Sequence, residues 1–282
     1  MHQKLVGSVW LRRYAVTVAC CTFALVVAGG LVTSNDAAGS IPDWPLNWGR
    51  LIPPLEANIR YEFAHRALAL VTTLLTAGLA WKLRTRLAWA ALVAVLAQGA
   101  LGGILVKFLD PGLAAVAHAA LAQLFFGITV ALVGRTIVFS PPPSAPPSPA
   151  PLIAAVALFA QTVLGAAVRH NLASPIPHIA GAVVATILVM WAGLSTLISH
   201  MDDPALRRPA LALLSLTFSQ VFLGIAAYTA RAAAAGAPQP MPVTVWITVA
   251  HVAVGSLAFG ASVVLAAQAG RPALLSQRTA TV

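Results

Sequence analysis

The sequence is poor in charged residues, which make up 9% of its 282 positions, whereas hydrophobic residues make up 59%. A soluble domain of this length needs more polar residues than that to cover its surface. The mean hydropathy of +0.86 agrees with this reading. The composition therefore excludes a soluble globular protein and indicates a polytopic membrane protein whose first partner is the lipid bilayer.

Acidic residues are scarce as well: seven Asp and Glu stand against seventeen Lys and Arg, which gives a net charge of +10. In a membrane protein such an excess arises from loop charges that orient the helices, so we do not interpret it as a nucleic-acid-binding surface. Six of the seven acids lie in connecting stretches, and Glu62 is the one that borders an apolar segment. No nucleic-acid partner is expected.

Cysteine is almost absent. The two cysteines, Cys20 and Cys21, are adjacent inside an apolar run. Neighbouring cysteines rarely bridge each other, and neither lies in a loop. No structural disulfide is therefore expected.

Eight apolar stretches are long enough to cross a hydrocarbon core of about 30 Å, which takes about 20 helical residues. The first stretch is too long for the apolar part of a signal peptide and is expected to be retained. The expected helices cover residues 14–33, 61–82, 87–106, 113–134, 151–168, 177–198, 208–229 and 243–267.

Lys and Arg are divided unevenly between alternate loops, with eleven on one side and six on the other. By the positive-inside rule, both termini lie in the cytoplasm and the long loop 34–60 lies outside. We therefore expect a multi-pass protein of the cell inner (cytoplasmic) membrane.

A proline-rich segment, residues 140–151 (SPPPSAPPSPAP), cannot continue a helix and favours extended structure. It separates an N-terminal half, residues 1–139, from a C-terminal half, residues 152–282. The expected fold class is an all-α membrane protein whose eight transmembrane helices form two pseudo-symmetric four-helix bundles.

An internal repeat relates the two halves. The odd-numbered helices end in related glycine patterns, such as Leu164-Gly165 and Leu223-Gly224, although a chain rich in Ala, Leu and Gly produces such matches easily. One histidine near the same end of every even-numbered helix is harder to obtain by chance, and these are His65, His118, His178 and His251. Because each half has an even number of helices, the halves should be parallel and related by an axis along the membrane normal.

These four histidines lie about 5–14 Å inside their helices, at ~1.5 Å per residue, and on the outer side of the membrane. Two imidazoles that face each other across a bundle can supply both axial ligands of a haem iron. The expected pairs are His65 with His118, and His178 with His251. Zinc is disfavoured because no third and fourth ligands accompany either pair. The alternative for any single histidine is an interhelical hydrogen bond.

Several charged residues accompany the histidines. Arg66, Arg169 and Arg231 lie on the outer side and are placed to bind haem propionates, with ordinary interfacial positioning as the alternative. Glu62, His65 and Arg66 are spaced to share one helix face. Ionisable groups that enter a membrane segment indicate a functional site. The alternative for Glu62 is a salt bridge to Arg60 or Arg66.

At this point the chain resembles the haem A synthase family. The resemblance is carried by Glu62-x-x-His65-Arg66 on the second helix, by Pro42-Asp43-Trp44-Pro45-Leu46 in the first outer loop, and by single histidines on the next three even-numbered helices. It covers essentially the whole chain. It implies an enzyme that oxidises the ring D methyl group of haem O to a formyl group, giving haem A for terminal oxidases.

The resemblance also implies roles for individual residues. His178 and His251 would hold a permanent haem b, His65 and His118 would face the substrate haem, and Glu62 would be the catalytic carboxylate. Haem O synthase would deliver the substrate, terminal oxidase assembly would receive the product, and a homo-oligomer is compatible with the family. Many members carry a cysteine pair in the first outer loop. Here Asn47 follows Leu46 and the loop has no cysteine, so a thiol-based redox role is not expected.

Two other functions remain open on the sequence. A di-haem cytochrome b-like electron carrier would bind both haems permanently. A transporter would use the repeat to gate a path and would protonate the histidines.

Overall fold

The computed structural model describes residues 8–108, 112–136 and 148–270, and within these residues the chain forms eight helices and no sheet. All eight are long and apolar enough to cross a membrane, which confirms the predicted fold class. Residues 140–147 of the expected linker lie outside the described part of the chain. The helices are α1 (Val9–Ser34), α2 (Ile59–Leu83), α3 (Arg86–Phe108), α4 (Gly112–Thr136), α5 (Ala150–Arg169), α6 (Pro175–His200), α7 (Pro204–Ala233) and α8 (Pro242–Ala269).

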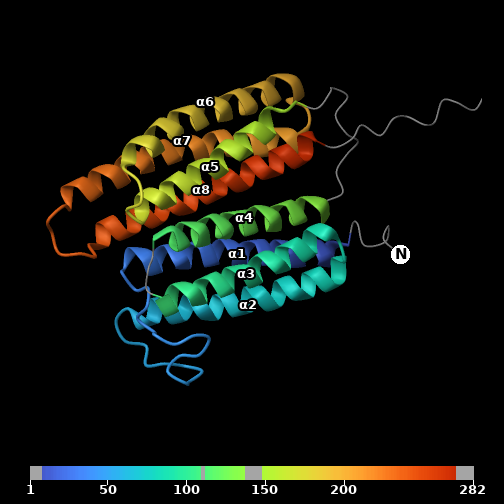
Figure 1. The fold of residues 1–282 in the computed structure, drawn as a ribbon. Helices are drawn as coiled ribbons and strands as arrows, with labels where there is room; N and C mark the ends of the chain where they lie inside the picture. Colours follow the sequence, from blue (N-terminus) through green and yellow to red (C-terminus); the bar gives the residue numbers. More distant parts are fainter. Residues whose placement is uncertain (1–7, 109–111, 137–147, 271–282) are drawn as a thin grey trace, which may run out of the picture.

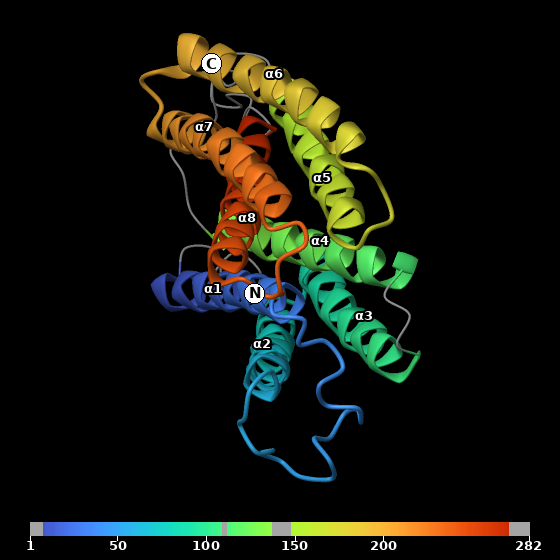
Figure 2. The same cartoon turned by 90° about the vertical axis from the view of Figure 1, so that its left-hand side faces the viewer.

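The helices form two groups of four (Figures 1 and 2). In the first group α1 packs on α2, α2 on α3, α3 on α4, and α4 on α1; α5 to α8 repeat this cycle. The groups meet through α1 with α8, α4 with α5, and α4 with α8. If the two halves are exchanged, the contact of α1 with α8 becomes that of α5 with α4, and the contact of α4 with α8 becomes itself.

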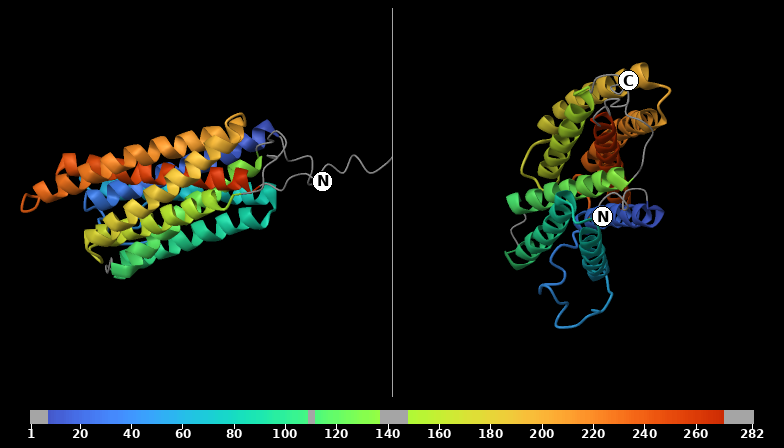
Figure 3. Two further views of the ribbon diagram at one scale, coloured as in Figure 1. Left: turned by 90° about the horizontal axis from the view of Figure 1, so that it is seen from above. Right: turned by 90° about the vertical axis from the view of Figure 1, so that its right-hand side faces the viewer.

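Two ends of the molecule can be distinguished. The loop 35–58 lies at one end, which we call the loop end, and every even-numbered helix begins there (Figure 1). The described chain starts and finishes at the other end, which we call the terminal end (Figure 3). All four histidines of interest lie in the part of their helices nearer the loop end.

The contact between α4 and α8 is reciprocal. A Cβ atom on Gly127 would lie 2.9 Å from Cε1 of Phe259, and one on Gly260 would lie 3.1 Å from Cε1 of Phe126. Each phenylalanine therefore covers the glycine of the other helix. Such exchange is what a two-fold axis requires. Because α4 and α8 run in the same direction, the axis is roughly parallel to the helices.

A polar contact marks the same axis. Nε2 of Gln123 on α4 donates a 2.8 Å hydrogen bond to Oγ of Ser256 on α8. Gln123 follows His118 by five residues, and Ser256 follows His251 by five residues. The two histidines are thus equivalent positions of the repeat, as the sequence predicts.

Small residues bring the helices close together inside each bundle. Ala15, Ala88 and Ala91 are buried in the N-terminal core, and Ala154 and Ala192 in the C-terminal core. Lipid tails are as apolar as leucine, so membrane helices associate through close packing rather than through the hydrophobic effect. The bundles use alanine and glycine for this purpose.

Candidate functional site

His178 on α6 and His251 on α8 face each other across the C-terminal bundle. Their ring centroids are 6.3 Å apart and their planes are nearly perpendicular, at 87°. Metal–nitrogen bonds of about 2.0–2.1 Å on both faces of one ion, plus the inner half of each ring, place the centroids of two imidazole ligands about 6 Å apart. The spacing therefore fits two axial ligands of one haem iron.

His65 on α2 and His118 on α4 occupy the equivalent positions in the N-terminal bundle. Their rings are near enough to interact electrostatically. The structure therefore brings His178 and His251 face to face, and His65 and His118 occupy the equivalent positions of the other half.

Each of the four imidazoles lies against a glycine of the preceding helix. Gly29, Gly102, Gly165 and Gly224 face His65, His118, His178 and His251, and a Cβ atom on them would lie 3.2, 3.3, 3.0 and 3.1 Å from the histidine Cε1. A methyl group at any of these positions would press against the ring. The glycine patterns, to which sequence reasoning gives little weight, thus have a common purpose: they make room for the histidines.

Ring nitrogens in both halves are buried without partners. Among the described residues, Nδ1 of His65, His118 and His251 has no hydrogen-bond partner. Buried polar atoms are nearly always hydrogen-bonded, so an unpaired one calls for a functional explanation. Together with the glycine recesses and the 6.3 Å spacing, these nitrogens fit histidines prepared to hold an iron porphyrin.

Three glutamines contact the histidines. Nε2 of Gln98 donates to the backbone carbonyl of His118 at 2.9 Å, and Nε2 of Gln161 donates to that of His178 at 2.6 Å. Nε2 of Gln220 lies 3.4 Å from Nε2 of His251. Sequence reasoning missed this role, although the spacing Gln-x-x-x-Gly occurs in α3, α5 and α7 and could have indicated it.

Glu62 is buried at the start of α2, with 4% of its surface exposed. Its Oε2 accepts hydrogen bonds from the backbone N–H of Ile41 at 2.9 Å and from Oγ of Ser40 at 3.0 Å. Its Oε1 pairs with Nη2 of Arg66. The salt bridge that the sequence leaves open as an alternative for Glu62 is therefore formed with Arg66 and not with Arg60.

Arg66 continues this network into the loop 35–58. Its guanidinium donates to the carbonyls of Ile41 at 2.8 Å, Asp43 at 2.7 Å and Leu46 at 3.1 Å. The Glu-x-x-His-Arg and Pro-Asp-Trp-Pro-Leu motifs, which sequence analysis treats separately, thus form one unit. We call Glu62, Arg66 and residues 40–46 the loop clamp.

The loop clamp reaches across to α3. A Cβ atom on Gly103 would lie 2.8 Å from Cδ2 of Trp44, so the indole covers this glycine. Gly103 is next to Gly102, which faces His118. The loop therefore joins the helix of His65 to the helix that supports His118, at the loop end of the N-terminal bundle (Figure 2).

The other two arginines of interest lie in the C-terminal half. Nη2 of Arg169 donates to the carbonyl of Gly30 and to Oγ of Ser34, both at 2.6 Å, and so links α5 to α1. Arg231 donates to Oδ1 of Asn171 at 2.8 Å. Neither forms an ion pair with any described residue. The two loops of the C-terminal half at this end, residues 170–174 and 234–241, contain no acid.

His170 is partly buried at the end of α5. Burial lowers the pKa of its imidazole, and the neighbouring Arg169 lowers it further. His170 is therefore neutral at physiological pH and leaves the positive charge at this position to Arg169.

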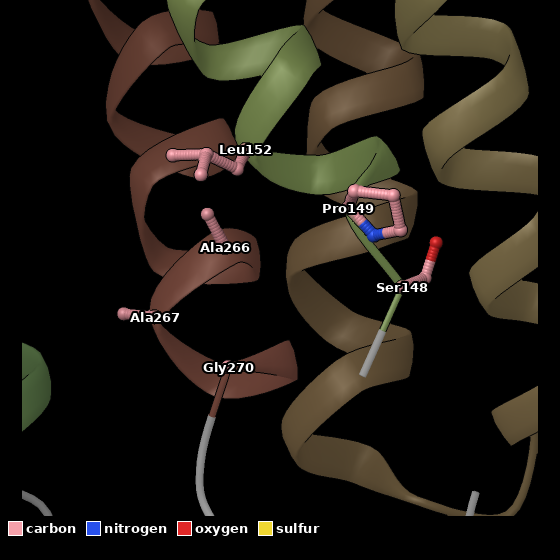
Figure 4. Close-up of a pocket in the computed structure, with 6 residues that line it drawn as sticks. All are labelled: Ser148, Pro149, Leu152, Ala266, Ala267 and Gly270. Carbon is pink, nitrogen blue, oxygen red and sulfur yellow. The ribbon is translucent and has the colours of Figure 1, made fainter. Parts of the chain in front are cut away.

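The pocket drawn in Figure 4 lies elsewhere, at the terminal end between the start of α5 and the end of α8. Its lining is small and mostly apolar: Ser148, Pro149, Leu152, Ala266, Ala267 and Gly270. It contains no side chain able to bind a metal or transfer a proton, so we do not assign it a function.

Asp43 fixes the fold of the clamped loop. Its carboxylate accepts hydrogen bonds from the N–H groups of Trp48 at 2.7 Å and Gly49 at 3.1 Å. Both residues have positive φ angles, 53° and 68°, which are unfavourable for a bulky residue such as tryptophan. The hydrogen bond from Trp48 is the main cause that lowers the pKa of Asp43 below its usual value.

Acid, or the substitution Asp43→Asn, is expected to open this turn. A carboxyl whose pKa is lowered in the folded state stabilises the fold above its unfolded pKa of about 3.9, and this contribution is lost as the pH falls through the folded value. Hydrogen–deuterium exchange at the Trp48 and Gly49 amides should therefore accelerate at neutral pH in Asp43→Asn but not in the control Asp36→Asn. Equal protection in the two variants would contradict this role.

Compared with known proteins, the chain matches no protein-family model and no curated protein.

Proposed function

We propose that the chain is a haem-modifying membrane oxidoreductase of the haem A synthase type, which converts the ring D methyl group of haem O to a formyl group. The observation that carries the proposal is the facing pair His178 and His251, with centroids 6.3 Å apart, repeated by His65 and His118 in the other half. Such a repeat offers two equivalent positions for a porphyrin. The resemblance of the two loop-end motifs to that family supplies the reaction.

The C-terminal half is proposed to hold the resident haem b. His178 and His251 would be its axial ligands, and when bound this group supplies one-electron transfer. Arg169 and Arg231 lie at the same end, near enough to affect each other electrostatically, and neither forms an ion pair among the described residues. Two guanidiniums without carboxylate partners suit the two propionates of a porphyrin.

The N-terminal half is proposed to bind the substrate haem between His65 and His118. Glu62 lies one helical turn before His65 and would be the catalytic carboxylate. A carboxylate in a low-dielectric site can accept a proton from the methyl carbon as that carbon is oxidised. With water as the oxygen donor, conversion of the methyl group to a formyl group adds one oxygen atom and releases four electrons and four protons, so the electrons must pass on to an acceptor.

Arg66 is engaged with the loop in this structure and not directed to an anion. Its proposed part is to hold the Glu62 side chain in place through their ion pair and to hold residues 41–46 over the N-terminal bundle. Both the position of Glu62, the proposed proton acceptor, and the position of the loop over the site would thus depend on Arg66.

The proposed setting follows from the spans and from the loop charges. Eight helices able to span a membrane make the protein multi-pass. We place it in the inner membrane with both termini in the cytoplasm, so that the loop end and both haem sites face the outer side. Haem O synthase and terminal oxidase assembly are the proposed neighbours in the process.

Haem analysis of the purified full-length protein tests this function. A reduced-minus-oxidised spectrum should show a b-type haem, and chromatography of the extracted pigment should show haem O or haem A beside haem B. Two molecules of haem B per chain and no other haem would favour a di-haem electron carrier instead. A protein without haem bands would favour a transporter and exclude both redox functions.

A further inference from the structure

The four histidines are not supported equally. Three of them face a glutamine that lies four residues before the glycine under the ring: Gln98 before Gly102, Gln161 before Gly165, and Gln220 before Gly224. Gln98 and Gln161 donate to the backbone carbonyl of their histidine. Nε2 of Gln161 and of Gln220 also lies 3.0 and 3.4 Å from a ring nitrogen of its histidine. Each one ties an odd-numbered helix to the histidine of the next helix.

The fourth histidine has no such support. Four residues before Gly29, under His65, the chain has Leu25, a buried side chain that cannot donate a hydrogen bond. The backbone carbonyl of Leu25 lies beside the His65 ring, just as those of Gln161 and Gln220 lie beside the rings of His178 and His251. What His65 lacks is the side-chain amide. Leu25 of α1 therefore stands where α3, α5 and α7 each have a glutamine.

His65 is instead held from its own helix. The loop clamp binds α2 through Glu62 and Arg66, which flank His65 in the sequence. The other end of the clamped loop rests on α3 through Trp44. The position of His65 therefore depends on a loop at the end of the bundle, whereas the other three depend on buried amides between helices.

We propose that Gln98, Gln161 and Gln220 are positioning residues for their histidines, and that His65 is the axial histidine that yields when the haem of the N-terminal half is exchanged. This inference rests on the proposed function and deepens it, since an enzyme must keep one haem and release the other. Groups that orient a ligating histidine typically change metal affinity roughly 10–100-fold. An axial ligand without such a group is the natural point of release.

The rate of haem release measures this asymmetry. The full-length protein, saturated with haem B, is mixed with excess apomyoglobin as haem acceptor, and transfer should occur in a fast and a slow phase. His65→Ala should remove the fast phase and His251→Ala the slow one, which assigns each phase to a half. Leu25→Gln is then expected to slow the fast phase by about tenfold, the lower limit for such groups.

A glutamine at position 25 would stand at the place equivalent to Gln98, Gln161 and Gln220. Gln161 and Gln220 lie against Gly181 and Gly255 of the next helix, whereas Gln98 bonds to His118 although α4 has Leu121 and Ala122 at the corresponding positions. A glycine on α2 is thus not required. Leu25→Met is the matched control, because it has similar length without the amide and should leave the fast phase unchanged.

Complementary variants test the three glutamines. Gln161→Leu and Gln220→Leu should accelerate the slow phase and shift the midpoint potential and the low-spin electron paramagnetic resonance signal of the resident haem. Gln98→Leu should accelerate the fast phase. Gln123→Leu, which removes a buried glutamine bound to Ser256 rather than to a histidine, should change neither phase.

The outcomes separate this inference from the proposed function. A protein that binds no haem, or none in its N-terminal half, refutes the proposed function and the inference together. Haem in both halves with one common release rate refutes the inference alone. So does an unchanged fast phase in both Leu25→Gln and Gln98→Leu, provided that the slow phase, an internal measure of correct folding, is preserved.

Discussion

Replacing His251 with alanine is expected to remove the resident haem b from the C-terminal half. Its imidazole faces that of His178 at the spacing of two ligands on one iron, and the bundle offers no third histidine among its described membrane residues near this pair. Outer partners of a ligating histidine typically change affinity roughly 10–100-fold, so loss of a ligand itself should lower haem b content at least tenfold. His178→Ala should have the same effect.

The measurement is the haem B content per chain, together with the reduced-minus-oxidised spectrum of purified protein. His200→Ala is the matched control, since His200 ends α6 at the terminal end of the molecule. It should retain the full signal. Retention of the full haem b signal by His251→Ala would show that the two imidazoles do not share an iron.

Substitution of Glu62 by glutamine is expected to abolish haem A formation while leaving the haem b spectrum intact. The amide still accepts hydrogen bonds from Ile41 and Ser40, but it cannot accept a proton or pair with Arg66 as a charge. General acid–base groups typically contribute roughly 10²–10⁴-fold to a rate. The product should therefore fall by at least the lower of these factors, as measured by chromatography of extracted haems.

Arg66 provides the comparison that separates catalysis from support of the loop. Loss of one partner of a fully buried ion pair costs about 3–5 kcal/mol of folding free energy. The cost is smaller here because the Arg66 side chain is partly exposed. Arg66→Ala should therefore loosen the loop. If Glu62 is catalytic, Glu62→Gln should form less haem A than Arg66→Ala. Its loop 35–58 should nevertheless be cleaved more slowly by a protease than the loop of Arg66→Ala. Equal product loss with equal loop cleavage would assign Glu62 to the loop clamp alone, and undiminished product would exclude both roles.

The loop-end residues show how far sequence reasoning extends at this site. The spacing of Glu62, His65 and Arg66 places them on one helix face, and the structure agrees, since Glu62 and Arg66 pair across one turn. The targets of these side chains could not be inferred. Arg66 bonds to the carbonyl of Asp43, 23 residues earlier, and backbone carbonyls leave no mark in a sequence.

The role of the glycines that contact the histidines could not be inferred from the sequence either. Their recurrence is visible in the sequence, yet glycine and alanine are so frequent here that recurrence alone has little weight. Contact with the imidazole Cε1 atoms gives them a reason. That contact joins residues of different helices, such as Gly29 and His65, and depends on how the helices are rotated against each other.

By itself, the sequence determined the spans, their number in each half and the depth of the four histidines, because a hydrocarbon core demands about 20 apolar residues per crossing and helix rise converts position into depth. Tertiary structure alone decided which faces meet: the phenylalanine–glycine exchange between α4 and α8, the glutamine supports and the loop clamp. The physical reason is that lipid is as apolar as a helix interface, so a membrane helix is hydrophobic all round and its pattern does not mark the buried side.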